Sequence, residues 1–265
     1  MAPLVERLKD EYTVITIEYF GYGLSDLTQK VRTIENITEE IHSVLKSLGY
    51  SRYTFMAHSI SGAYGLYYAN QYPEEVESFV GIDTSLPKQN DYMHTQSINL
   101  VMAYIMRFAN ITGIYRIISR ITPRIMIDEV NGFRRSQQDI KLLRMLYLNK
   151  LYNTCVINEL KNSTENFKKA KDMKFPKEIQ VLFFLSSQSC VRLEQWYALH
   201  EDIITDKIRS QIITLEGPHY LHYQYAEEIT NIFIGMDRRQ VNLQPVKYAL
   251  RTNKNSRQVK NSSLR

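Results

Sequence analysis

A chain of 265 residues, of which 44% are hydrophobic, has the length and apolar content for one large α/β domain with a substantial core. Its apolar stretches are shorter than the roughly 18 residues of a membrane-spanning helix, and its first residues lack the apolar segment of a secretion signal. Its two cysteines, Cys155 and Cys190, form neither a disulfide framework nor a metal-ligand spacing. These features predict a reduced, cytoplasmic protein without a membrane span.

The formal net charge of +5 comes from the end of the chain. Residues 237–265 contain eight Lys or Arg residues and one acid, Asp237, so this segment carries +7 and the rest of the chain −2. A nearly neutral body argues against a nucleic-acid-binding domain. We therefore predict that residues 237–265 form a basic disordered tail, with a weak surface-binding role as the lesser alternative.

Alternating strand and helix patterns indicate an α/β organisation in the first 82 residues. Tyr12–Ile17 is rich in β-branched residues and predicts a buried strand, and two glycines in the next loop, residues 18–26, predict a tight turn. Thr33–Leu48 has apolar residues at helical spacing and is followed by Gly49. The other expected elements are a helix end at Leu4–Lys9, strands at Tyr53–Met56 and Glu77–Ile82, and a helix at Ala63–Ala69.

The following segment, residues 88–170, is predicted to be helical. Apolar residues recur at helical spacing over residues 98–108, 114–125 and 142–151, and Pro123 interrupts the second of these stretches. The α/β pattern then returns. We expect a buried strand at Ile179–Leu185, a helix at Leu193–Thr205, a strand at Gln211–Leu215 and a closing helix at Gln224–Met236.

Residues 53–68, YTFMAHSISGAYGLYY, predict a strand, a sharp turn and a helix with Ser59 at the apex. This is the geometry of a nucleophile elbow, in which the residues two places before and after the serine must be small. Ala57 and Ser61 meet that requirement. The alternative interpretation is an ordinary strand–helix joint with a surface serine. At this stretch the sequence resembles the α/β-hydrolase superfamily, whose Gly-x-Ser-x-Gly pattern appears here as Ala-x-Ser-x-Ser, with Gly62 one place later.

The resemblance extends to the loop after the first predicted strand, where Gly21 and Gly23 match the family's Gly-x-Gly spacing. It implies an α/β-hydrolase fold with a mostly parallel sheet, a core formed by residues 1–87 and 171–236, and a helical cap at residues 88–170. In the family, about three more strands and a His-Gly loop precede Leu4. We therefore expect an N-terminally truncated member, from a shortened gene or a misassigned start codon; the alternative is that the missing strands are dispensable.

The resemblance also suggests the catalytic groups. A serine hydroxyl needs a base, and His219 follows a strand and a Gly-Pro turn where the family carries its catalytic histidine; His222 is the rival. The usual acid position, after the strand at Ile179–Leu185, contains no carboxylate. Asp83, at the end of the preceding strand, is therefore predicted to orient His219. Asp202 and Glu194 are the fallback choices.

The backbone N–H of Ile60 is predicted to hold the oxyanion, assisted by the start of the following helix. The family's second donor belongs to the His-Gly loop, and losing one donor lowers turnover by about a hundredfold to a thousandfold. We accordingly expect a triad of Ser59, Asp83 and His219 whose activity is impaired.

The predicted function is a serine hydrolase that cleaves a small ester, thioester or amide with an apolar part through an acyl-enzyme. The alternative is a non-catalytic remnant of the fold or a binding protein, and acyl transfer or cofactor-free oxidation on the same triad stays open. We expect no cofactor, no metal and no nucleic-acid partner. The substrate and the oligomeric state are left open.

Overall fold

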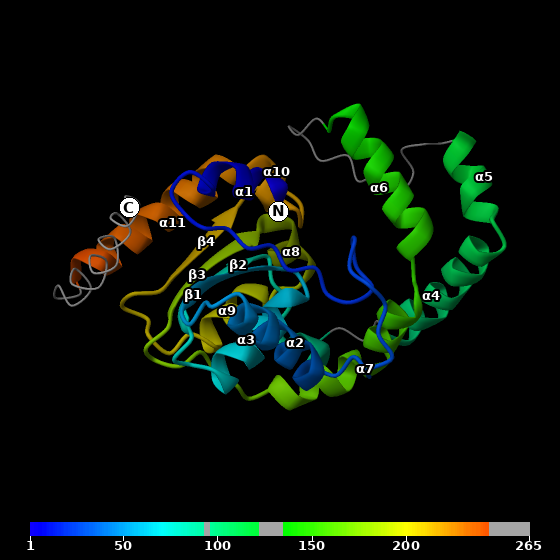
Figure 1. Cartoon of the computed structure of the whole chain (residues 1–265). Helices are drawn as coiled ribbons and strands as arrows, with labels where there is room; N and C mark the ends of the chain where they lie inside the picture. Colours follow the sequence, from blue (N-terminus) through cyan, green and yellow to red (C-terminus); the bar gives the residue numbers. More distant parts are fainter. Residues whose placement is uncertain (93–95, 122–134, 244–265) are drawn as a thin grey trace, which may run out of the picture.

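A computed structural model describes residues 1–92, 96–121 and 135–243 (Figure 1). Its centre is a parallel sheet of four strands in the order β1-β2-β3-β4. The strands are β1 (Tyr53–His58), β2 (Val76–Ile82), β3 (Gln180–Ser186) and β4 (Gln211–Leu215). Each matches a strand expected from the sequence to within two residues at either end. The expected parallel α/β organisation is confirmed.

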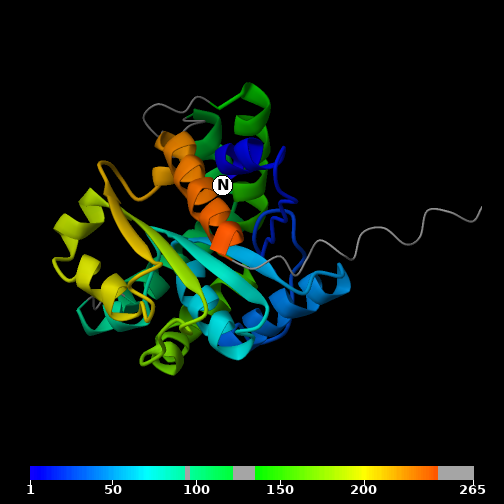
Figure 2. The ribbon, with the colours of Figure 1, turned by 90° about the vertical axis from the view of Figure 1, so that its left-hand side faces the viewer.

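Helices cover both faces of the sheet, so β2 and β3 are buried almost throughout, as is usual for parallel strands. Side chains of β2 alternate between two apolar clusters: Phe79 packs with one face and Val80 with the other. The first face is covered by α2 (Ile34–Ser47), α3 (Ser61–Gln71) and α9 (Trp196–Asp202). The second is covered by α1 (Ala2–Leu8), α10 (Leu221–Gln224) and α11 (Ala226–Leu243), which lie together in Figures 1 and 2.

A helical segment connects β2 to β3, where the sequence predicts the cap. It consists of a short 3-10 turn, η1 (Pro87–Asp91), and the helices α4 (Gln96–Ile111), α5 (Ile114–Ile121), α6 (Gln137–Lys150) and α7 (Thr154–Ala170). Helix α7 returns the chain to the core, whereas α4, α5 and α6 extend away from the sheet (Figure 1). Pro123, the expected break, lies outside the described residues.

Three local expectations are corrected by the structure. Tyr12–Ile17 forms no strand: Ile15 and Ile17 pack on one apolar cluster and Val14 on the other, but no ladder of hydrogen bonds joins this segment to a neighbour among the described strands. The helix expected over Leu193–Thr205 is limited to α9, Trp196–Asp202. A separate short helix, α8 (Ser187–Arg192), precedes it, and Leu193–Gln195 connects the two.

The third correction concerns the closing helix. It is divided into α10 and α11, and α11 continues to Leu243, past the expected start of the tail. Tyr12 donates a hydrogen bond to the Asp237 carboxylate at 2.9 Å, so the first residues of that predicted tail are packed against the N-terminal segment. Residues 244–265 lie outside the described part.

Within residues 1–92, 96–121 and 135–243, no helix is both long enough and apolar enough to cross a lipid bilayer. Cys155 is a buried free thiol and Cys190 a half-buried one. Cys155 contributes to a local contact: its Sγ accepts a hydrogen bond from the Thr28 N–H at 3.3 Å. This contact connects the loop before α2 to the start of α7.

The closeness of α3 to the sheet predicts a large effect of Gly65→Ala. A Cβ on Gly65 would overlap the Phe79 ring of β2, so α3 would have to move away from the sheet. We expect the free energy of unfolding to fall by about 1–3 kcal/mol in urea denaturation. The matched control is Gly235→Ala in α11, where a Cβ meets no atom within 4 Å and removal of a helical glycine should stabilise by about 0.5–1 kcal/mol. Equal effects of the two changes would contradict this account.

Candidate active site

Ser59 occupies a sharp turn between β1 and α3. Its backbone is in the left-handed region, with φ of 56°, a conformation that non-glycine residues adopt at a cost. The turn is held by neighbouring backbone groups: the Ser59 carbonyl accepts hydrogen bonds from the N–H groups of Gly62 at 3.0 Å and Ser85 at 2.8 Å. The structure therefore has the strained strand–turn–helix geometry that the sequence predicted around Ser59.

The glycine one place later than in the family pattern has a steric role. A Cβ on Gly62 would overlap the Cβ of Thr84, so the first turn of α3 lies directly against the residue that follows Asp83. Ser61, at the position of the expected glycine, is only half-buried and has room for a side chain. The need for a small residue at this joint is therefore met by Gly62.

Asp83 follows the last residue of β2 and its side chain is fully buried. Its carboxylate accepts four hydrogen bonds. The donors are the Ser186 N–H at 3.0 Å, the Trp196 indole N–H at 2.9 Å, the Ser189 hydroxyl at 2.6 Å and His219 Nδ1 at 2.7 Å. Burial by itself raises the pKa of Asp83, but hydrogen bonds from His219, Ser189 and the other donors outweigh it and hold the pKa below the usual range. Asp83 is therefore an ionised, fixed acceptor.

His219 lies in the loop after β4, and its ring is partly exposed. This loop is tied to the end of β3, because the Ser186 hydroxyl donates to the Gly217 carbonyl at 2.6 Å and the Gly217 N–H to the Ser187 hydroxyl at 3.1 Å. Since His219 Nδ1 faces Asp83, its Nε2 is the nitrogen available to a reacting group.

His219 also lies beside the elbow. The rings of His219 and His58, the residue before Ser59, have centroids 4.5 Å apart, and His58 Nε2 is 3.1 Å from the His219 carbonyl oxygen. The structure thus brings Asp83, His219 and the Ser59 turn to one edge of the sheet. Among the described residues, the Ser59 hydroxyl forms no hydrogen bond with His219.

The other histidines have different surroundings. His222, the rival base, is buried in α10, its Nδ1 has no partner among the described residues, and burial lowers its pKa to about 2. His200, in α9, is fully buried against Thr84, and burial lowers its pKa to about 4. His42 pairs with Glu75 at 3.1 Å. His94 lies outside the described residues.

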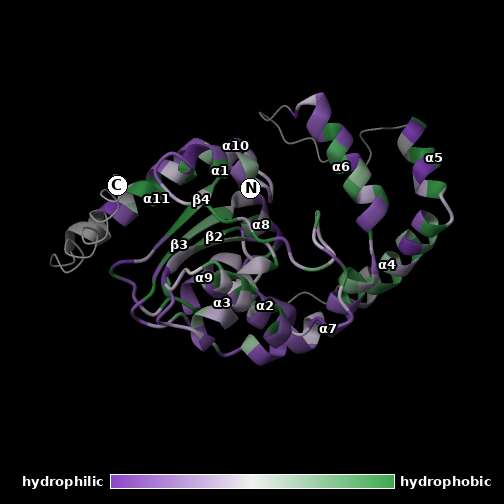
Figure 3. Cartoon of the chain, in the orientation of Figure 1, coloured by the Kyte–Doolittle hydropathy of each residue, from purple (hydrophilic) through white to green (hydrophobic). Residues whose placement is uncertain are grey.

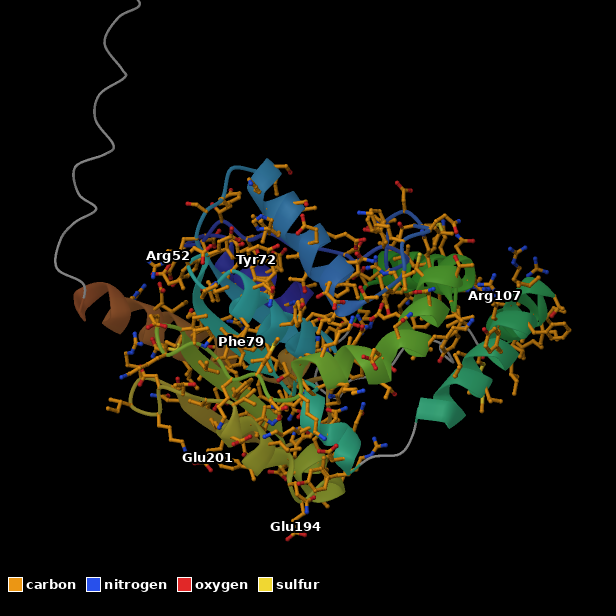
Figure 4. The ribbon with its side chains drawn as sticks, turned by 90° about the horizontal axis from the view of Figure 1, so that it is seen from below. Arg52, Tyr72, Phe79, Arg107, Glu194 and Glu201 are labelled. Carbon is orange, nitrogen blue, oxygen red and sulfur yellow. The ribbon has the colours of Figure 1, made fainter. Side chains whose placement is uncertain are left out.

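The fallback acids lie elsewhere. Asp202 forms salt bridges with Lys88 at 2.6 Å and Lys174 at 3.0 Å. Glu194 is exposed at the outer edge of the molecule (Figure 4). Neither carboxylate contacts His219, so Asp83 is the acid that the structure places against this histidine.

Two of the residues around Asp83 were not anticipated from the sequence. Ser189, in α8, and Trp196, at the start of α9, both donate to its carboxylate. The available signal was the serine-rich stretch Ser186–Ser189 directly after β3, where the family usually has its acid. A hydroxyl at that place can donate a hydrogen bond to a carboxylate at the end of the neighbouring strand, as Ser189 does to Asp83.

Ile60 is the N-cap residue of α3, and its backbone N–H donates no hydrogen bond within the described part of the chain. Because a helix start concentrates unpaired N–H groups and positive potential, this position suits a developing negative charge. Ile60 directly follows Ser59 in the turn between β1 and α3.

A buried polar cluster lies beside the same helix. The Tyr64 hydroxyl of α3 donates to Glu159 of α7 at 2.5 Å, and burial raises the pKa of Glu159. The Tyr19 ring, in the loop after Tyr12–Ile17, packs edge-on against both Tyr22 and Tyr64. Burial raises the pKa of Tyr19 to about 12. The cluster connects residues 19–22 with helices α3 and α7.

The fold agrees with a family match. Residues 1–106 match the model of a family described as the alpha/beta hydrolase fold. The chain is 22% identical over 245 residues to the uncharacterized protein YbdG of Bacillus subtilis, covering 90% of this chain and 74% of that protein.

Solved structures give the same result at low identity. Cfl2 from Burkholderia cenocepacia superposes with a TM-score of 0.69 at 12% identity, covering 88% of this chain and 82% of that one. A thermophilic esterase from Thermogutta terrifontis gives 0.64 at 18% identity, with coverages of 90% and 84%. An epoxide hydrolase from Bacillus megaterium gives 0.64 at 14% identity, with coverages of 89% and 88%. The chain has the α/β-hydrolase fold.

The donors around Asp83 predict how the protein responds to acid. Because the folded-state pKa of Asp83 is lowered, its carboxylate stabilises the fold above its unfolded pKa, and this stability is lost as the pH falls through the folded pKa. Ser189→Ala removes one donor, raises the folded pKa and should cost about 1–3 kcal/mol near neutral pH. We expect acid unfolding, followed by circular dichroism, to begin at a higher pH than in the parent protein.

The control is Ser51→Ala, since Ser51 is exposed in the short connection before β1. It should leave the acid transition in place. A Ser189→Ala transition that coincides with that of the control would show that the hydroxyl does not hold the Asp83 carboxylate.

Proposed function

We propose that this protein is a serine hydrolase that cleaves a small ester, thioester or amide with an apolar part through an acyl-enzyme. The observation that carries the proposal is the 2.7 Å hydrogen bond from His219 Nδ1 to the buried Asp83 carboxylate, next to the strained turn of Ser59. A base oriented by a buried carboxylate beside a serine hydroxyl is the arrangement that activates serine.

In the proposed reaction, the Ser59 oxygen attacks the substrate carbonyl while His219 Nε2 takes its proton. Asp83 keeps Nδ1 protonated and stabilises the imidazolium that forms. The Ile60 N–H stabilises the oxyanion of the tetrahedral intermediate. His219 then gives the proton to the leaving group, which departs as alcohol, thiol or amine. A water molecule, deprotonated by His219, releases the acid from Ser59 by the same steps.

The apex residue supports acyl chemistry over other reactions of this fold. The fold alone does not select a reaction, and the similar solved structures include both an esterase and an epoxide hydrolase. Ser59 provides a hydroxyl nucleophile, which with a carbonyl substrate gives an acyl-enzyme that water can hydrolyse. An ester, thioester or amide is therefore the substrate class that we propose.

The second candidate is a non-catalytic protein of the same fold. It is favoured by the lack of a hydrogen bond between the Ser59 hydroxyl and His219 among the described contacts. Catalytic hydrogen bonds are often long without substrate, so this observation by itself is weaker than the Asp83–His219 pair. The two candidates differ in whether Ser59 reacts covalently.

The first test is the reactivity of Ser59. The parent protein should hydrolyse p-nitrophenyl butyrate and be labelled by a fluorophosphonate probe, whereas Ser59→Ala should lose the label and at least about a thousandfold in kcat/KM. His219→Asn should behave like Ser59→Ala, because it removes the base. Ser51→Ala serves as the serine control. Hydrolysis that Ser59→Ala retains would exclude Ser59 as nucleophile, and a folded parent protein that neither hydrolyses nor labels would favour the non-catalytic candidate.

The second test concerns Asp83. In Asp83→Asn the amide can donate to His219 Nδ1 and favour the tautomer whose Nε2 carries the proton, so that the ring cannot take one from Ser59. We expect kcat to fall by about a thousandfold or more with little change in KM. Asp202→Asn, which removes a surface carboxylate paired with two lysines, is the matched control and should retain activity. If the two variants had equal activity, Asp83 would have no catalytic role.

A further inference from the structure

Helices α4 and α5 expose a continuous set of large apolar side chains. On α4 the exposed residues follow one side of the helix, whereas Ala103, on the opposite side, is fully buried where α4 packs against α7. The set continues along α5 at a spacing of three and four residues. Its members are Val101, Ile105, Phe108, Ile111, Ile114, Ile117 and Ile121. Phe108 is 66% exposed, Ile111 71% and Ile121 76%, so this stripe contributes little to the core of the described protein.

The same part of the chain is strongly cationic. Residues 96–150 contain nine Lys or Arg residues and three acids, a net charge of +6. One of those acids, Asp139, is used in the cap of α6, where it accepts hydrogen bonds from Ser136. The remainder of the chain before residue 237 is therefore acidic overall, and the cation excess lies on the arm formed by α4, α5 and α6.

Part of this charge gathers between α5 and α6. A cleft of about 340 Å³ there is lined by Arg116, Arg120, Lys141 and Arg144, together with Met145, Leu148 and Asn149. No carboxylate lines it within the described chain. Arg116 and Arg120 lie on the same short helix as the exposed Ile117 and Ile121, so cations flank the apolar stripe. The arm stands away from the sheet, and its helices show both kinds of residue (Figures 1 and 3).

We propose that the arm formed by α4, α5 and α6 docks on the surface of an anionic phospholipid membrane. The exposed isoleucines and Phe108 would enter the boundary between headgroups and acyl chains, and the arginines and Lys141 would lie at the level of the lipid phosphates. An apolar stripe flanked by cations matches such a surface, because the apolar side chains can reach the acyl chains while the cations contact the lipid phosphates. The proposed contact is peripheral and involves the surface of the bilayer alone.

Two other occupants fit less well. A second copy of the arm would place a net charge of +6 against another +6, and a symmetric interface would bring the same cations together. A nucleic acid would satisfy the cations, but its phosphate backbone offers no apolar layer for Phe108 and the isoleucines. The membrane surface accounts for both features with one contact. The inference is independent of the proposed reaction, since it concerns residues of the cap and is tested by binding.

The experiment is sedimentation of the full-length protein with vesicles of equimolar phosphatidylcholine and phosphatidylglycerol, compared with pure phosphatidylcholine. We expect binding to the anionic vesicles that weakens in high salt. Ile117→Asn/Ile121→Asn, which removes apolar side chains, and Arg120→Gln/Lys141→Gln, which removes charge, should each weaken binding at least about tenfold. All variants retain residues 244–265, so the basic residues there do not affect the comparison.

The matched controls are Ile208→Asn and Lys177→Gln. Ile208 is 97% exposed in the loop before β4, and Lys177 is exposed before β3. Both should bind as the parent does, and circular dichroism should show unchanged helix content in every variant. Equal binding to pure phosphatidylcholine, or unchanged binding of Ile117→Asn/Ile121→Asn, would overturn the proposal. So would self-association in sedimentation velocity that this variant abolishes while vesicles bind nothing, which would identify a second copy as the occupant.

Discussion

The buried carboxylate of Asp83 is the constraint on which the candidate site depends. An ionised carboxylate removed from water is costly unless donors surround it, and here four donors converge on its two oxygens. They come from the end of β3, from α8, from α9 and from the loop after β4. One side chain therefore ties together segments that are more than a hundred residues apart in sequence. The orientation of His219 follows from this arrangement, because its Nδ1 is one of the four donors.

Much of the site could be predicted from the sequence because parallel strands end at the same edge of a sheet. Ser59, Asp83 and His219 each follow a strand whose position is readable from a short β-type run, so their side chains were expected to meet. Ser189 and Trp196 could not be found in this way. Their role depends on how α8 and α9 pack over the end of β3, and no spacing in the sequence specifies the partner of an indole N–H or of a serine hydroxyl.

Two other features show what local sequence patterns do not predict: the pairing partner of a strand and the burial of a helix face. The β-branched residues of Tyr12–Ile17 pack alternately on two apolar clusters as a strand would, yet a strand also needs a neighbour to bond with, which no local pattern provides. The periodic apolar residues of α4 and α5 correctly predicted helices. Periodicity usually indicates a face that packs on the core, but here the face stays exposed, and only the three-dimensional structure separates these cases.

The register of the sheet explains how the acid can stand on β2. Ile82 pairs with Phe184, the Asp83 N–H donates to the Phe184 carbonyl at 2.7 Å, and the Ser186 N–H returns to the Asp83 carboxylate. The ends of β2 and β3 are thus adjacent, and a carboxylate from either can reach the loop of His219. Supplying it from β2 requires a left-handed backbone at Asp83, with φ of 43°, which aspartate tolerates better than most residues.

The two placements also exclude each other. A second carboxylate in place of Ser189 would face Asp83 in a buried environment, where like charges at hydrogen-bond distance raise the pKa of one partner. Such a pair would share protons with each other and leave His219 without a fixed acceptor. Serines at the end of β3 avoid this conflict because a hydroxyl donates to the carboxylate. The position of the carboxylate at the end of β2 therefore accounts both for the lack of an acid after β3 and for the serines found there.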